Sequence, residues 1–369
     1  MAGARPVNDG AREPPAGLAA LLAREGPMPL SRFMALAMFA RDRGYYATRD
    51  PLGARGDFVT APEISQCFGE LLGAALAQAW LERGSPAPVT LVELGPGRGT
   101  LLLDLLRATA KVPGFHAALA LDLVEASPRL RAIQAERLGA FAPRFHDRLE
   151  TVADDRPLLL VANEFLDVLP IRQLVRTAAG WRERLVGADA EGRFGFLLSP
   201  WTVPGPGAAV PEGTVIELSP AREAVVAEAA RRIAARGGLA LFVDYAKEGA
   251  EGDTLQAVRG HRLVDPFATP GEVDLSSKVD FAALARAARA RGAAVFGPVT
   301  QKCFLERLGI RTRLARLAQG KPPAVAAELE SGVHRLLDPE GMGTLFRVLA
   351  LTGAEEPVPP GFLASERVP

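Results

Sequence analysis

From about residue 88 onward, short apolar runs alternate with stretches whose apolar residues recur at helical spacing. Strands are predicted at VTLVEL, ALALDLVEAS, PRFHDRL, PLLLVANEF and LALFVDYA, and helices at TLLLDLLRATAKV, PRLRAIQAERL and REAVVAEAARRIAARGG. Such alternation is typical of a parallel sheet with helices on both faces. The unbroken apolar runs LLLVA and LALFV indicate strands that are covered on both sides. The expected fold class is therefore α/β, with a doubly wound, Rossmann-like sheet.

The first part of the chain follows a different pattern. Residues 1–14 are rich in Pro and Gly with mixed charge, which predicts a flexible tail. Residues 15–87 predict a helical N-terminal region. This region contains the Gly-, Pro- and Asp-bearing loop GDFVTAPEIS.

Two interruptions are expected within a domain that spans 88–350. Residues 170–218 hold strand-like pieces broken by Gly and Asp, which predicts an antiparallel insertion. Residues 247–278 lack helical period and are expected to form a long loop, a kind of segment that often serves binding. After residue 279 the pattern predicts a helix, a strand at AAVFGPVTQ and further helices, followed by a C-terminal tail at 351–369.

Composition narrows the classes of partner. The 43 basic residues balance the 43 acidic ones, so bulk charge gives no support for a nucleic-acid partner. The apolar stretches are too short to cross a bilayer, and the first residues lack the apolar core of a secretory signal. Cys67 and Cys303 are far apart, and with four scattered histidines they offer no metal-ligand spacing. A reducing cytoplasm is the expected compartment.

The stretch TLVELGPGRGT predicts a strand-to-helix turn that lies under a bound nucleoside. Gly95, Gly97 and Gly99 allow positive φ and close approach of a ligand, although the spacing GxGxG lacks the third glycine of GxGxxG. Glu93 at the strand end would repel a pyrophosphate but can pair with an ammonium. S-adenosylmethionine therefore suits the turn better than NAD does. The alternative is an ordinary strand–turn–helix with incidental glycines.

Polar residues follow the next three predicted strands at the edge where ligands bind in open α/β sheets. Glu125 is expected to accept from ribose hydroxyls, and Asp147 from the adenine amino group. Asn163 and Glu164 follow the run LLLVA. Each of these strand-end residues also has a plainer interpretation, as a surface carboxylate or a turn residue. Asp122 lies inside its predicted strand and is less suited than Glu125 to bind a ribose. Together with Glu93, these residues place polar side chains at the ends of four predicted strands, and that coincidence favours a cofactor site.

At this point the residues resemble a known family. The MidA-like proteins, class I S-adenosylmethionine-dependent methyltransferases, are similar over about residues 15–350, in the strings GDFVTAPEISQCFGELLG, VELGPGRGT, VEASPRLRAIQ, VANEFLDVLPIRQL and GDTLQAVRGH. The resemblance implies a class I methyltransferase fold and methylation of a protein arginine. In mitochondrial members, which act in the matrix, the acceptor is a subunit of the respiratory NADH dehydrogenase. It also implies that Glu93, Gly95, Gly97 and Gly99 form the cofactor turn, with Glu125 at the ribose and Asp147 on the adenine side. Pro96 within the turn and Asn163 after LLLVA are further candidates for cofactor binding.

A guanidinium acceptor is charged and delocalised, so carboxylates are expected to hold it. Glu164 is the preferred candidate, because it follows the strand that faces the methyl group in this fold. Asp167, Asp57 and Glu63 are further candidates; helix-terminal and turn-capping carboxylates are the plainer interpretations. His261 is a lone loop histidine that is more often a surface group than a base.

Two other functions stay open on the sequence. An NAD-dependent oxidoreductase would need the GxGxxG turn, which fails here. A non-catalytic chaperone for assembly of the respiratory complex would keep the cofactor site without turnover. Oligomeric state, target arginine and number of methyl groups cannot be inferred from the sequence.

Overall fold

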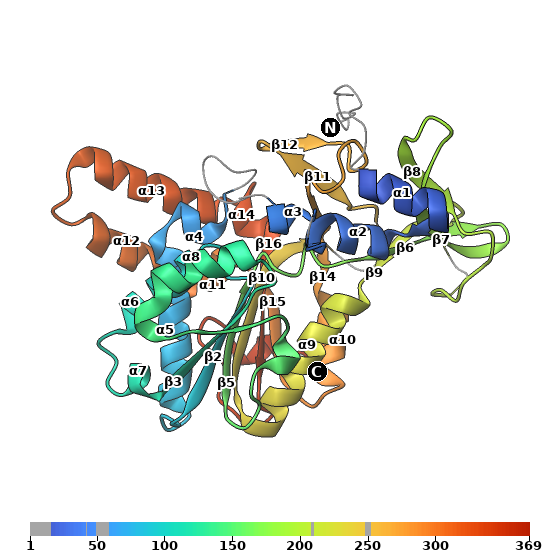
Figure 1. Ribbon diagram of the computed structural model, residues 1–369. Coiled ribbons are helices and arrows are strands. Elements are labelled where there is room, and N and C mark those ends of the chain that lie inside the picture. Colours follow the sequence, from blue (N-terminus) through green and yellow to red (C-terminus); the bar gives the residue numbers. More distant parts are fainter. Residues whose placement is uncertain (1–15, 42, 49–58, 208–209, 248–251) are drawn as a thin grey trace. The chain divides into compact units, whose positions relative to one another are not determined.

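The computed structural model describes residues 16–41, 43–48, 59–207, 210–247 and 252–369. The chain divides into two compact units, and each is described by itself. The core unit comprises residues 59–166, 223–246 and 281–369. The insertion unit comprises residues 1–58, 167–222 and 247–280. Figure 1 colours the ribbon along the chain and labels many of the elements.

The core unit is built on a mixed sheet in the order β15-β16-β10-β5-β2-β3-β4. Neighbouring strands from β10 to β4 are parallel, and β16 is antiparallel to both β10 and β15. The first five strands of this unit thus follow the doubly wound order 3-2-1-4-5, which confirms the expected α/β class. The strands are β2 (Val89–Leu94), β3 (Leu119–Val124), β4 (Arg144–His146), β5 (Leu158–Asn163), β10 (Gly238–Lys247), β15 (Ala294–Thr300) and β16 (Phe346–Thr352).

Strand β16 corrects the expectation that only helices follow β15. The segment Phe346–Thr352 comes after several helices, yet it returns to the sheet and lies between β10 and β15. Nearly all its residues are buried, because both faces of the sheet are covered there.

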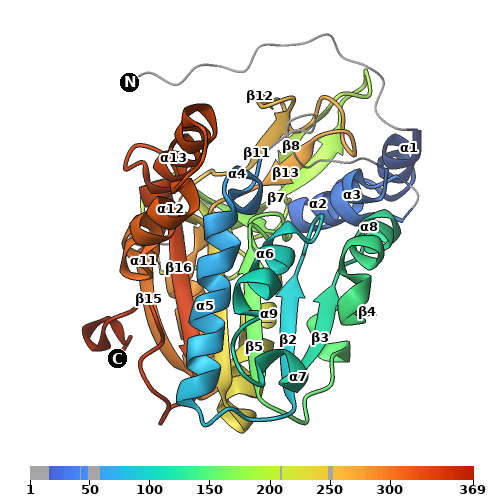
Figure 2. The same cartoon turned by 90° about the vertical axis from the view of Figure 1, so that its left-hand side faces the viewer.

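Helices cover both faces of this sheet, with α5 and α6 on one face and α9 and α10 on the other (Figures 1 and 2). The long helices are α5 (Gln66–Glu82), α6 (Thr100–Thr109), α8 (Pro128–Leu138), α9 (Pro220–Arg236), α10 (Phe281–Arg289), α12 (Ile310–Ala318) and α13 (Pro323–Leu337). The short ones are α4 (Ala61–Ile64), α7 (Phe115–Ala118), α11 (Gln301–Arg307), α14 (Met342–Leu345), η1 (Gly139–Phe141), η2 (Leu149–Thr151) and η3 (Ala364–Glu366).

Helices α5 and α6 approach each other closely at two glycines. A Cβ atom at Gly69 would lie 2.8 Å from the Cβ of Asp104, and one at Gly73 would lie 2.9 Å from the Cα of Leu105. Both distances are shorter than carbon atoms tolerate. The first turn of α6, which follows the glycine turn, is therefore held against α5 with no side chain between the backbones.

The insertion unit is antiparallel. One sheet has the order β1-β7-β6-β9 with β8 on β7, and a smaller sheet has the order β12-β11-β13. This confirms the antiparallel character expected for residues 170–218. The elements are α1 (Ala16–Glu25), β1 (Met28–Pro29), α2 (Leu30–Phe39), α3 (Tyr45–Thr48), β6 (Arg172–Thr177), β7 (Gly180–Ala188), β8 (Phe194–Leu198), β9 (Val215–Leu218), β11 (Gln256–Arg259), β12 (Arg262–Val264), β13 (Asp274–Ser276) and β14 (Val279–Asp280).

The segment expected as a loop at 247–278 contains three short strands. Strands β11, β12 and β13 have four, three and three residues. Strands this short, separated by Gly, Asp and Pro, leave too little alternation for a strand pattern to be recognised.

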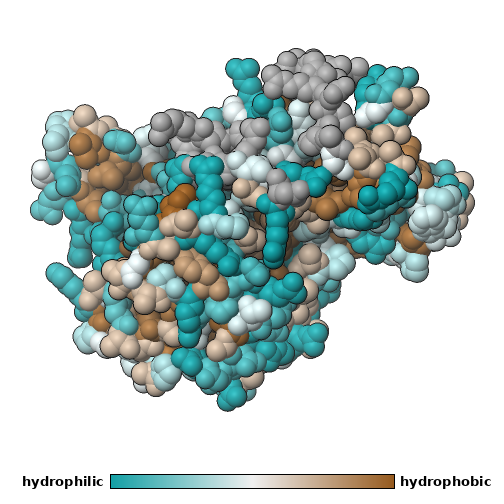
Figure 3. Space-filling model, in the orientation of Figure 1, coloured by the Kyte–Doolittle hydropathy of each residue, from teal (hydrophilic) through white to brown (hydrophobic). Residues whose placement is uncertain are grey.

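The surface is mixed in character. On the face seen in Figure 3, hydrophobic residues lie among hydrophilic ones. Among the described residues, no helix is both long and apolar enough to cross a membrane.

Candidate functional site

The glycine turn has the geometry that its sequence predicts. Gly95, Gly97 and Gly99 have φ of +62°, +56° and +75°, values that favour glycine over any residue with a Cβ. The amide of Gly99 donates to the Pro96 carbonyl at 2.7 Å, which closes the turn, and Gly99 then forms the N-cap of α6. A Cβ at Gly95 would lie 2.8 Å from Cδ2 of Phe165, so the ring of Phe165 covers this side of the turn.

Glu93 lies beside the turn as a buried acid that lacks a counter-charge among the described residues. Glu93 is 3% exposed, and its Oε2 atom has no hydrogen-bond partner in the described part of the chain. Burial, reinforced by the nearby Glu125 carboxylate, raises the pKa of Glu93 to about 8. A buried acid of this kind is stabilised by a cation that arrives with a ligand.

Glu125 follows β3, and both oxygens of its carboxylate are held. Oε1 accepts from the Ser127 amide at 2.8 Å, and Oε2 accepts from Nε2 of Gln134 at 3.2 Å. Burial raises the pKa of Glu125, although the bonds from Ser127 and Gln134 oppose that shift. The carboxylate is thus fixed in place at the end of the strand.

Asp147 follows β4 and is linked to Glu125 through one arginine. The guanidinium of Arg131 donates to Oδ1 of Asp147 at 2.7 Å through Nη2 and to the Glu125 carbonyl at 2.6 Å through Nε. The Asp147 side chain is exposed. The carboxyl ends of β3 and β4 are therefore cross-linked by Arg131 of α8.

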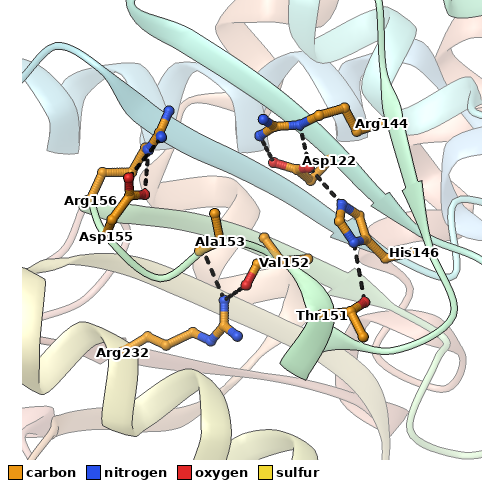
Figure 4. A network of polar contacts seen from close by, with 9 residues as sticks. All are labelled: Asp122, Arg144, His146, Thr151, Val152, Ala153, Asp155, Arg156 and Arg232. Atoms are coloured by element: carbon orange, nitrogen blue, oxygen red, sulfur yellow. Dashed lines mark hydrogen bonds and ion pairs between the residues drawn. The ribbon is translucent and has the colours of Figure 1, made fainter.

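Asp122 has a different part in this region. It is fully buried within β3, where it accepts two hydrogen bonds from Arg144 and approaches Nε2 of His146 at 2.7 Å (Figure 4). His146 in turn contacts the Thr151 hydroxyl. The network ties β3 to β4 in the sheet, so Asp122 has its hydrogen-bonding capacity taken up there.

The carboxyl end of β5 carries a backbone outlier. Glu164 has φ of +50°, which is uncommon for a residue with a side chain and often marks a functional site. Its Oε1 accepts from the amide of Ala61 at 3.0 Å and from Nδ2 of Asn163 at 2.9 Å. The Glu164 side chain thus connects the end of β5 to the first residue of α4. The neighbouring Oδ1 of Asn163 is buried and has no partner among the described residues.

Glu63 lies in the same short helix and reaches the cofactor turn. Its Oε1 accepts from the hydroxyl of Thr100 at 2.5 Å. Thr100 is the first residue of α6 and also accepts from Arg137 of α8 at 3.1 Å. Helix α4 is therefore bonded both to the β5 end and to the residue that follows the glycine turn.

The other acceptor-side candidates fall elsewhere. Asp57 lies outside the described residues. Asp167 belongs to the insertion unit, where burial raises its pKa to about 6 against the opposing effect of the Arg222 guanidinium. Arg222 also donates to the Asp167 carbonyl at 2.7 Å and to the Ser277 hydroxyl at 2.6 Å. His261 is exposed in the turn between β11 and β12.

Sequence reasoning missed two residues of this site. Gln134 is fully buried against Glu125 and the glycine turn, and Asp244 near the end of β10 accepts from the Leu166 amide at 2.8 Å. Both had a signal in the sequence. Gln134 interrupts the apolar positions Leu130 and Leu138 at helical spacing, and Asp244 follows the apolar run LALFV.

Comparison with known proteins agrees with this geometry. Residues 71–299 match the model of a family described as "Putative S-adenosyl-L-methionine-dependent methyltransferase". The mitochondrial protein arginine methyltransferase NDUFAF7 of Danio rerio is 35% identical over 90% of this chain and 85% of its own length. The human protein of that name is also 35% identical, over 88% of this chain and 80% of its own length.

A solved structure decides the assignment. A COG1565 superfamily member from Burkholderia thailandensis, crystallised with S-adenosyl-homocysteine, superposes with a TM-score of 0.83 at 32% identity, over 96% of this chain and 95% of the other. This chain belongs to the MidA-like family of class I methyltransferases. The cofactor of this MidA-like methyltransferase is S-adenosylmethionine, as the sequence predicted.

Proposed function

We propose that this methyltransferase acts on an arginine side chain of a protein, with a subunit of the respiratory NADH dehydrogenase as the acceptor. The support is the 35% identity to proteins named as arginine methyltransferases, over most of both chains. The choice of that respiratory enzyme rests on what the resemblance to the MidA-like family implies.

The cofactor is held, in this proposal, by the residues around the glycine turn. Glu93 receives the ammonium of its amino-acid part, Glu125 the ribose hydroxyls, and Asp147 the adenine amino group. The backbone of Gly95, Pro96, Gly97 and Gly99 lies against the nucleoside, and Asn163 lines the side toward the acceptor. The buried Oε2 of Glu93, unpartnered among the described residues, is the observation that fits a cationic ligand best. When bound, S-adenosylmethionine supplies an electrophilic methyl group on a sulfonium.

The acceptor is held, in this proposal, by carboxylates at the end of β5. The single observation that carries this assignment is the strained backbone of Glu164, which keeps its carboxylate at the ligand-binding edge of the sheet. A carboxylate there aligns a guanidinium and concentrates lone-pair density on the nitrogen that faces the methyl group. Glu63 orders the same edge through Thr100. Asp57 and Asp167 remain proposed contributors to acceptor binding.

Labelling in a lysate tests the proposal. Extract from a strain that lacks this gene is incubated with the purified protein and S-adenosylmethionine carrying a labelled methyl group. We expect label in a protein band, and peptide mass spectrometry should place it on an arginine of an NADH dehydrogenase subunit. A Gly97→Val protein serves as the control that cannot bind cofactor. Label on a small metabolite, or on a residue other than arginine, would contradict the proposal.

A further inference from the structure

One face of helix α8 is bonded to three parts of the predicted cofactor site: the glycine turn, Glu125 and Asp147. Arg131 bonds to the Glu125 carbonyl and to Asp147, and Arg137 donates to the Arg98 carbonyl at 2.7 Å. Between them lies Gln134, three residues from each, on the same side of the helix. The cofactor turn, the end of β3 and the end of β4 are thus all bonded to this one element.

Gln134 makes the central pair of contacts. Its Nε2 donates to the Gly97 carbonyl at 2.7 Å and to Oε2 of Glu125 at 3.2 Å. The residue is 0% exposed, so water does not compete for either bond. A Cβ at Gly99 would lie 3.1 Å from Cδ1 of Leu138, which shows how closely α8 lies on the turn.

We infer that Gln134 is a positioning residue for the cofactor, which sets the Glu125 carboxylate and the Gly97 backbone in one fixed relation. One amide nitrogen donates its two protons to the two acceptors. Neither acceptor can therefore move relative to the other without breaking its bond to Gln134. Partners of this kind, behind the groups that touch a ligand, change binding when they are lost. The inference rests on the cofactor assignment and not on the identity of the acceptor.

A buried glutamine elsewhere in the core unit provides a matched control. Gln301 of α11 is also 0% exposed, and its Nε2 donates to the Leu336 carbonyl at 2.9 Å. In both glutamines Oε1 is buried without a hydrogen-bond partner among the described residues. The two side chains therefore share burial and bonding type, and only Gln134 contacts the cofactor turn.

The first experiment compares Gln134→Leu with Gln301→Leu. Both should lower the melting temperature, because each leaves a buried carbonyl without its donor. Calorimetric affinity for S-adenosylhomocysteine should fall by about 10- to 100-fold in Gln134→Leu, the range typical when a group that supports a metal ligand is lost. It should stay within about threefold in Gln301→Leu. Equal affinities in the folded fractions of both variants would overturn the inference.

The second experiment uses a pH profile that a purely structural residue would not change. In Gln134→Glu the introduced carboxyl can donate a proton only while it is protonated, and once ionised it repels both the Gly97 carbonyl and Glu125. The ratio of the variant's Kd to the parent's Kd should therefore grow as pH rises from about 5.5 to 8. Glu93 and Glu125 are present in both proteins, so the profile of the parent is the reference for their contribution. A ratio that is constant over this range would overturn the inference.

The outcomes separate this inference from the proposed function. If the parent protein does not bind S-adenosylhomocysteine, both the cofactor assignment and the role of Gln134 are wrong. If the parent binds it and Gln134→Leu binds equally well, only the role of Gln134 is wrong. Label on an acceptor other than arginine would leave the inference untouched.

Discussion

The two halves of the carboxyl edge of the core sheet are built differently. At the ends of β3 and β4, the carboxylates of Glu125 and Asp147 are bonded to α8, an eleven-residue helix. At the end of β5, a single strained residue, Glu164, is bonded to α4, a helix of four residues. The first half is hydrogen-bonded to the long helix α8, whereas the second is hydrogen-bonded to the short helix α4.

The difference suits two separate proposed roles. In the half proposed to bind the cofactor, the carboxylates of Glu125 and Asp147 are oriented by hydrogen bonds from Ser127, Gln134 and Arg131. In the half proposed to bind the acceptor, Glu164 is bonded to a helix too short to be stable by itself. We therefore expect changes in the first half to alter cofactor affinity, and changes in the second to alter methyl transfer.

The largest effect is expected from Gly97→Val. A branched side chain at φ of +56° is strained, and it would occupy the space proposed for the nucleoside. Binding of S-adenosylhomocysteine, measured by calorimetry, should be lost while the protein stays folded. Gly309→Val is the control, because Gly309 has φ of +86° at the start of α12 with open space around it. Unchanged affinity in a folded Gly97→Val protein would move the site elsewhere.

The next effect is expected in the acceptor half. Glu164→Gln keeps an oxygen that can accept from Ala61 and Asn163 but removes the charge proposed to hold the guanidinium. Methyl transfer to the labelled acceptor should fall by about 100-fold, in the range for loss of one key polar group. Cofactor affinity should change by no more than a few-fold, as measured by calorimetry on the same sample. A normal transfer rate would show that Glu164 only anchors α4.

Glu125→Ala tests the cofactor half with a smaller expected loss. Removing charge-assisted hydrogen bonds to the ribose should weaken binding of S-adenosylhomocysteine by roughly 1.5–3 kcal/mol, or about 10- to 150-fold. Asp122→Asn is the control on the same strand. Asp122 bonds to Arg144 and His146, so its loss should affect stability and not cofactor binding. It should lower thermal stability and leave affinity nearly unchanged. If the two variants exchange these results, the assignments of Glu125 and Asp122 are reversed.

The smallest effect is a pH dependence at Glu93. With its pKa near 8, Glu93 is mostly protonated in the ligand-free protein at neutral pH. An incoming ammonium displaces that proton, so affinity for S-adenosylhomocysteine should rise about tenfold from pH 6.5 to 7.5, one proton being worth tenfold per pH unit. Calorimetry in buffers of different ionisation enthalpy should detect the released proton. Glu93→Gln should bind with nearly constant affinity over this interval, and an unaltered pH slope in that variant would contradict the assignment.

The same shift affects the stability of the ligand-free protein. Because the folded pKa of about 8 exceeds the ordinary 4.5, the folded state binds the proton more tightly than the unfolded state does. This contribution to stability is complete below about pH 4.5, declines as pH rises, and is lost above about pH 8. Denaturation of ligand-free Glu93→Gln should lack this decline.

Local patterns in the sequence were sufficient for the parallel part of the fold. The apolar runs at β2, β3, β5 and β10 and the turn at Gly95 to Gly99 carry their signals within a few residues. The family and its cofactor followed from the same strings. Strand β16 could not be placed in the same way, because its partners β10 and β15 are fixed by packing between distant segments.

The candidate site was only partly accessible from the sequence. Acids at strand ends are visible as polar residues that follow apolar runs, as at Glu125 and Glu164. What holds them is not visible, since the Gln134 bond to Gly97 joins residues 37 positions apart. The positive φ of Glu164 is likewise set by its tertiary surroundings, because no local rule assigns that conformation to a glutamate.

The glycine pair of α5 bears on how this protein can diverge over generations. Gly69 and Gly73 fix the spacing of α5 and α6, and α6 begins at the cofactor turn. Two positions more than 20 residues from the turn therefore decide where it lies. Lineages that keep the cofactor should retain small residues at both positions even as the rest of α5 drifts. A descendant that accepts a larger residue there has to shift α6, and with it the turn.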